Sequence, residues 1–146
     1  MTITRARIAG PLAASIALAA ATGCGSPDPA TLVASPGPHA DPPHVVQALV
    51  DGINARDEDL VRSLTSEGFG SYLVDVWFEG AHLTEATIGT SDAAGLAQPE
   101  ESATVNVEFT PEGADASMQN GTAISWGFFL ITDESGRWLV EDVGQG

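Results

Sequence analysis

The residues that could bind a metal or attack a substrate are few in this 146-residue chain. Its single cysteine is Cys24, and its three histidines, His39, His44 and His82, are too scattered for a zinc site. The acidic run at 57–59 lacks the alternating ligands and central glycine of a calcium loop. The sequence has no glycine-rich phosphate loop and no serine in a nucleophile elbow. It therefore predicts no metal and no cofactor, and Cys24 remains to be explained.

Cys24 follows a segment with the pattern of a secretory signal peptide. Two arginines among the first seven residues precede an uncharged, mostly aliphatic run from Ile8 to Ala21. As a helix this run would span only about 21 Å, which is too short to cross a bilayer. Residues 1–23 are therefore predicted to be a cleaved leader and not a transmembrane anchor.

The sequence Ala21-Thr22-Gly23-Cys24 resembles a bacterial lipobox, although Ala21 stands where a leucine is usual. The resemblance implies that Cys24 becomes the lipidated first residue, with more than one acyl chain (palmitate among them), on the extracytoplasmic face of the plasma membrane. An unpaired cysteine is otherwise hard to explain in a secreted chain. The alternative is cleavage after Ala19-Ala20-Ala21, which would release a secreted protein with a free thiol.

The segment that follows Cys24 is predicted to be a tether. Residues 25–43 contain six prolines, and Gly, Ser, Ala and Asp make up most of the rest. Such a composition buries too little apolar surface to order itself. Extended as polyproline II, at about 3.1 Å per residue, it could hold a domain up to ~60 Å from a membrane. Residues 24–43 are thus interpreted as anchor and linker, and 44–146 as one domain.

The chain is strongly acidic, with a net charge of −15. All 20 acidic residues follow Cys24, against only Arg56, Arg62 and Arg137 there and no lysine anywhere. This charge excludes nucleic acid as a partner and repels anionic lipid head groups. It favours neutral or cationic partners, while the simpler interpretation is that the acidity keeps the protein soluble.

Two short helices are expected at the start of the domain. Apolar residues recur at helical spacing over 45–53 and again over 60–64. Asp57 is the expected N-cap of the second helix, and Glu67-Gly68 its expected end. Residues 69–80 fit either a helix or a strand.

Alternating apolar and polar residues predict antiparallel strands in the second half. A short candidate at 85–90 precedes longer ones at 102–110 and 122–132, and a turn at 133–137 leads into the last, 137–143. One face of the third candidate carries Ile124, Trp126, Phe128 and Leu130. Helices first and an antiparallel sheet afterwards make an α+β domain.

The paired helices of "VVQALVDGINARDEDLVRSLTSEGF", the strand "SATVNVEFT" and the ending "SGRWLVEDV" resemble the nuclear-transport-factor-2-like superfamily. The ending has a Gly-x-Trp-x-x-x-Asp pattern, formed by Gly136, Trp138 and Asp142. The resemblance covers about 100 residues and implies a cone, in which N-terminal helices pack on a curved antiparallel sheet. It also implies that 69–80 form a third short helix and that a pocket lies between helices and sheet.

Enzymes of this superfamily, such as ketosteroid isomerases and polyketide cyclases, need a carboxylate base in an apolar cavity and a tyrosine or second acid beside it. The set that could supply these groups here is Tyr72, Asp75 and His82. The simpler interpretation is that Tyr72 is an aromatic residue at the core edge and Asp75 a solvated acid. We therefore expect a binding protein and keep a cavity enzyme as the alternative.

The candidate ligand pocket consists of Tyr72, Trp77, Trp126 and Phe128, which would suit an apolar or amphiphilic ligand. Tryptophans at strand positions are more often part of the core. Three hypotheses follow: a module that binds a small apolar ligand or a cell-envelope protein, which we favour, a cavity enzyme, and a structural domain that forms homodimers through the outer face of its sheet.

Overall fold

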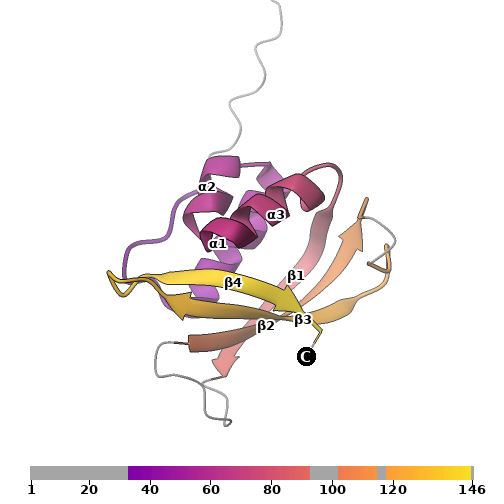
Figure 1. Cartoon of the computed structure of the whole chain (residues 1–146). Helices are drawn as coiled ribbons and strands as arrows, with labels where there is room; N and C mark the ends of the chain where they lie inside the picture. Colours follow the sequence, from indigo (N-terminus) through magenta and orange to yellow (C-terminus); the bar gives the residue numbers. More distant parts are fainter. Residues whose placement is uncertain (1–32, 93–101, 115–117, 146) are drawn as a thin grey trace, which may run out of the picture.

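The fold has three helices followed by four strands (Figure 1). A computed structural model describes residues 33–92, 102–114 and 118–145. The helices are α1 (Pro42–Ala55), α2 (Glu58–Ser63) and α3 (Glu67–Trp77), and the strands are β1 (His82–Asp92), β2 (Ser102–Glu112), β3 (Ile124–Thr132) and β4 (Trp138–Gly144). The predicted α+β class is confirmed. Within the described ranges, no helix is both long and apolar enough to cross a bilayer.

Helix α1 forms at the predicted apolar repeat and starts slightly earlier than residue 44. The Asp41 side chain accepts a hydrogen bond from the His44 N–H at 3.1 Å, and proline occupies the first helical positions, where its missing N–H costs nothing. The helix ends at Ala55, and the capping residue that follows, Arg56, has a left-handed φ of 59°. Upstream of it, Val33 and Ala40 already pack against the core.

The start of helix α2 agrees with the prediction, and its end does not. Asp57 caps α2 as predicted, since its side chain accepts the Leu60 N–H at 3.0 Å. The predicted end at Glu67-Gly68 is wrong, because α2 stops at Ser63 and Glu67 begins α3. The physical reason is that the segment 64–66 leaves the helical path and pairs with the backbone of Val140 in β4.

Residues 69–80, which fitted two patterns, are helical over most of their length. Helix α3 begins two residues earlier, at Glu67, and buries Leu73 and Trp77 against the core. The strand alternative is therefore wrong. The helical alternative, which the resemblance implied, is confirmed.

The four strands form an antiparallel meander in the order β1-β2-β3-β4. The three helices cover one face of this sheet (Figure 1). The sheet is not strongly curled, unlike the cone that the resemblance implies. Strands β1 and β4 are the two edges of the sheet.

The two faces of the sheet follow the predicted alternation. On the helix side Val105 lies opposite Phe128 and Val107 opposite Trp126, and these residues belong to the core or pack against it. On the outer side Phe129 lies over Gly127, where an added methyl group would come within 3.3 Å of the ring. The predicted inner face of β3 is thereby confirmed.

Candidate functional site

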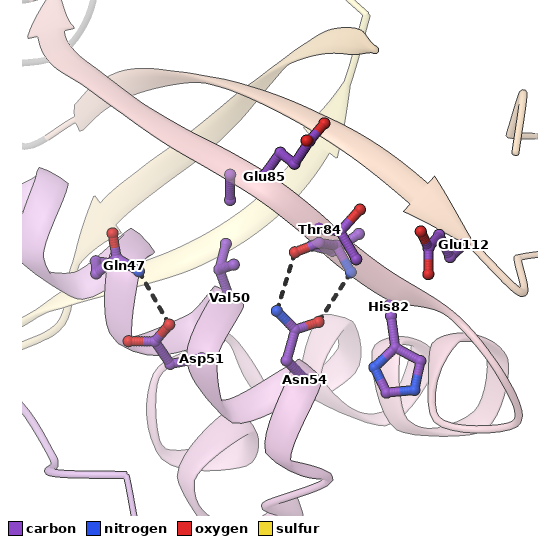
Figure 2. Close-up of a pocket in the computed structure, with 10 residues that line it drawn as sticks. Gln47, Val50, Asp51, Asn54, His82, Thr84, Glu85 and Glu112 are labelled. Atoms are coloured by element: carbon purple, nitrogen blue, oxygen red, sulfur yellow. Dashed lines mark hydrogen bonds between the residues drawn. The ribbon is translucent and has the colours of Figure 1, made fainter. Parts of the chain in front are cut away.

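A hollow of about 530 Å³ lies between α1 and the first half of β1 (Figure 2). Helix α1 and the edge strand supply most of its wall, and the end of β2 completes it. The lining residues are Gln47, Val50, Asp51, Asn54, His82, Leu83, Thr84, Glu85, Ala86 and Glu112. The hollow is thus an open groove beside an edge of the sheet.

Asn54 joins the two walls of the groove. Its Nδ2 donates to the Leu83 carbonyl at 3.0 Å, and its Oδ1 accepts the Leu83 N–H at 2.8 Å. Alternate residues of an edge strand direct their N–H and C=O groups away from the neighbouring strand, and those of Leu83 point toward α1. A side-chain amide thus occupies the place that a further strand would take.

The groove is acidic. Asp51, Glu85 and Glu112 line it, and among the lining residues only His82 could carry a positive charge. Asp51 accepts a hydrogen bond from Gln47 Nε2 at 3.0 Å, and Glu85 accepts one from Thr110 Oγ1 at 3.3 Å. The described residues contain no group of three or more His, Cys, Asp or Glu side chains that could hold a metal ion. The groove therefore offers separate carboxylates to a cationic partner.

Glu85 lies at an irregularity of the edge strand. Thr84 pairs with Thr110 and Thr87 with Glu108, so two residues of β1 face one residue of β2 in a β-bulge. Glu85 itself has a φ of 53°, in the left-handed region that glycine and asparagine favour. Such strain at a non-glycine residue is often found at functional positions.

The predicted aromatic pocket residues lie partly in the core and partly on the surface. Trp77 is 3% exposed and Phe128 is fully buried, whereas Tyr72 is 50% exposed and stacks on Phe69. Trp126 packs against Trp77 and edge-on against Phe109, with ring centroids 6.0 and 5.8 Å away.

Space beside this aromatic cluster is small. A hollow next to Trp77, lined also by Val76, Ala81, Ala114 and Met118, measures about 10 Å³, which is room for about one water molecule. The buried Trp126 Nε1 has no hydrogen-bond partner among the described residues. The structure thus brings Trp77 and Trp126 together as packed side chains, and their role in ligand binding stays a prediction.

The residues proposed for acid–base catalysis are all exposed to solvent. Tyr72 and Asp75 lie on α3, and His82 begins β1 and lines the acidic groove. Neither Tyr72 nor Asp75 lines that groove. The described residues therefore build no apolar enclosure around these three side chains. Cys24 lies outside the described residues.

A second hollow, of about 330 Å³, lies between α2 and α3 and is lined by Arg62, Thr65, Glu67, Gly70 and Ser71. Arg62 is already engaged there, because its guanidinium bonds Glu58 at 2.8 Å and Ser71 Oγ at 2.9 Å. The site therefore offers an anion less charge than the arginine alone suggests.

The acidic groove was missed at the level of sequence. Asn54 and Leu83 are 29 positions apart, and no spacing rule connects them. One signal was available in the sequence: a polar residue, Asn54, directly after the apolar repeat of α1.

The chain matches no protein-family model, and a comparison with curated proteins finds no match.

Proposed function

We propose that this chain is a lipoprotein, anchored through Cys24 to the extracytoplasmic face of a bacterial plasma membrane, whose domain binds a protein of the cell envelope without catalysing a reaction. The observation that carries the binding function is the groove between α1 and β1. It combines an open strand edge with three carboxylates, features that suit a polypeptide better than a small apolar molecule.

The lipid anchor rests on the residues before the domain. An uncharged run over 8–21 precedes Cys24, and the Pro-rich segment that follows ends where Asp41 caps α1. A tether of this composition would present the domain at a distance from the membrane. The acidity of the domain would keep it away from anionic lipid head groups.

We further propose that the domain is a shallow member of the nuclear-transport-factor-2-like superfamily. Three helices packed on one face of a four-stranded antiparallel meander support this assignment. The weak curl of the sheet is a departure from the cone, and it fits an interior filled by Phe109, Trp126 and Phe128. A filled interior favours binding at the outside of the domain.

The second candidate is assembly through the outer face of the sheet. Phe129, Ile131 and Leu139 are partly exposed, lie on adjacent β3 and β4, and do not pack against the core. An apolar patch of this kind can bury itself against another copy. The net charge of the chain opposes such self-association, which is why a different partner comes first.

Two measurements test the proposal. Mass spectrometry of the mature protein from native membranes should find Cys24 at the N-terminus with acyl chains attached, and an unmodified N-terminus at Thr22 would contradict the anchor.

A photo-crosslinking residue in place of Gln47, which lines the groove, should give a discrete heteromeric adduct in intact cells. The same residue in place of Ser135, in the exposed β3–β4 turn, is the control. No adduct from either position would contradict binding, and an adduct of twice the chain mass would favour assembly.

A further inference from the structure

We propose that the groove between α1 and β1 binds an extended, basic segment of the partner protein, which pairs with the edge of β1 and places lysine or arginine side chains against Asp51, Glu85 and Glu112. The inference rests on the proposed function, because it names the chemistry of the partner and the surface that holds it. It commits to one mode of binding, the addition of a strand to a sheet edge.

The backbone of β1 supplies the first argument. In an edge strand, the N–H and C=O groups of alternate residues point away from the neighbouring strand. In β1, those of Leu83 point toward the groove. Asn54 meets them with one donor and one acceptor, the same pair that the N–H and C=O of one residue in an incoming strand would offer. Farther along β1 the edge continues to Asp92. The strand thus accepts amide partners on this side, and only one is already in place among the described residues.

Charge supplies the second argument. Carboxylates stand on both sides of the groove, Asp51 on the helix and Glu85 and Glu112 on the sheet (Figure 2). Side chains of an added strand alternate between two directions, so a segment with basic residues at neighbouring positions would meet both walls. A strand of neutral or acidic residues would leave these carboxylates unpaired or repelled.

The same charges select against the wrong partners. Bulges and charged residues are the usual protection of an edge strand against pairing with copies of itself. A second copy of the mature chain carries 20 acidic residues and only Arg56, Arg62 and Arg137 as basic ones, so its own strands would be repelled. The same carboxylates attract a basic segment. Specificity then arises because they repel acidic segments.

The probe is the nonapeptide Thr-Lys-Lys-Val-Lys-Lys-Val-Lys-Thr, which carries lysines on both faces when extended, added to the full mature chain. Binding is measured by fluorescence anisotropy, and its location by the amide chemical shifts of residues 82–92. We expect micromolar or weaker binding that falls as salt is raised, with the largest shifts in the first half of β1. A second peptide of the same sequence, N-methylated at alternate residues, keeps the charges and loses half of its backbone donors. It should bind at least tenfold more weakly.

The matched variants have equal changes in charge. Asp51→Asn, Glu85→Gln and Glu112→Gln together should weaken peptide binding by about tenfold, since each exposed ion pair contributes modestly. The control triple, Asp59→Asn, Glu134→Gln and Glu141→Gln, neutralises exposed acids outside the groove and should change binding less than twofold. Amide spectra of both triples should show that the fold is intact.

Three outcomes would overturn the inference: no peptide binding, equal weakening by the two triples, which indicates diffuse attraction, or equal binding of the N-methylated peptide, which excludes strand pairing. These failures are distinguishable from failure of the proposed function. A heteromeric crosslink from Gln47 that persists in the groove triple would keep the partner and discard the basic segment. The absence of any crosslink would discard both.

Discussion

The two edges of the sheet are closed in different ways. At β4, backbone closes on backbone: the Ser66 N–H donates to the Val140 carbonyl at 2.9 Å, and the Val140 N–H donates to the Leu64 carbonyl at 2.9 Å. At β1, which packs against α1, the described hydrogen bonds between the two elements are those of the Asn54 side chain to the Leu83 backbone. The remainder of β1 is interrupted by two register shifts.

The difference indicates that the β4 edge is part of the fold and that the β1 edge is a surface available for binding. The segment 64–66 cannot leave β4 without uncoupling α2 from α3, because it is the connection between them. A side chain can rotate away from β1 while both elements stay in place. An edge held by a side chain is therefore open to exchange, and an edge held by the main chain is structural.

The largest expected effect is on the β4 edge. Gly70→Ala should lower the free energy of unfolding by about 2–3 kcal/mol, because the new methyl group would overlap Oγ1 of the buried Thr65, the residue that bridges to Val140. Denaturant unfolding measures this loss. The control is Gly68→Ala in the same helix, where the methyl group meets nothing within 4 Å and should stabilise by about 0.5–1 kcal/mol. Equal effects of the two would show that the bridge is unimportant.

Asn54 is expected to have a smaller effect at the β1 edge. Asn54→Ala should cost about 1–2 kcal/mol, because the Leu83 N–H and carbonyl lose their partners. Asn54→Asp should lower the free energy of unfolding further near neutral pH, because its carboxylate and the Leu83 carbonyl are both acceptors. This additional loss should vanish in acid, where the carboxyl group is protonated and can donate. Gln47→Ala, an exposed residue of the same helix, should stay within about 0.5 kcal/mol. Unfolding curves at two pH values decide this.

The bulge in β1 gives an effect of opposite sign. Glu85→Gly should stabilise the fold by about 0.5–1 kcal/mol, because glycine adopts the observed φ of 53° without a steric penalty. Glu108→Gly, at an exposed and regular position of the neighbouring β2, should destabilise by a similar amount. If both variants destabilise, the left-handed conformation of Glu85 costs less than the backbone freedom that glycine adds. Thermal and denaturant midpoints provide the measurement.

The turn that leads into β4 should show the smallest effect, and only in acid. Hydrogen bonds from Ser135, the Arg137 N–H and the Arg137 charge lower the pKa of Asp133 from 3.8 to about 2. A depressed carboxyl pKa stabilises the fold above pH 3.8, and that contribution is lost as the pH falls through 2. The stability gap between wild type and Asp133→Asn should therefore shrink between pH 4 and 2. A gap that is constant over this range would show that the turn does not depend on the charge.

Local patterns in the sequence predict most of the fold. Alternation alone assigns Val105 and Val107 to the core side, and the spacing of Asp57 from the next apolar pair gives a helix start. The end of α2 was misplaced because its cause is Val140, more than 70 positions away in the chain. The groove was missed for the same reason, since Asn54 and Leu83 meet only after α1 packs along β1. Nothing in the local sequence around Glu85 signals its left-handed backbone.

Val33 and Ala40, which pack on the core just before α1, determine how the domain would respond to a mechanical load. A force applied from the N-terminal side reaches these two contacts first and the cap at Asp41 next. The chain would peel from the helical layer inward, one contact at a time, before any hydrogen bond between strands is loaded. The last part of the molecule to yield under such a pull is the sheet.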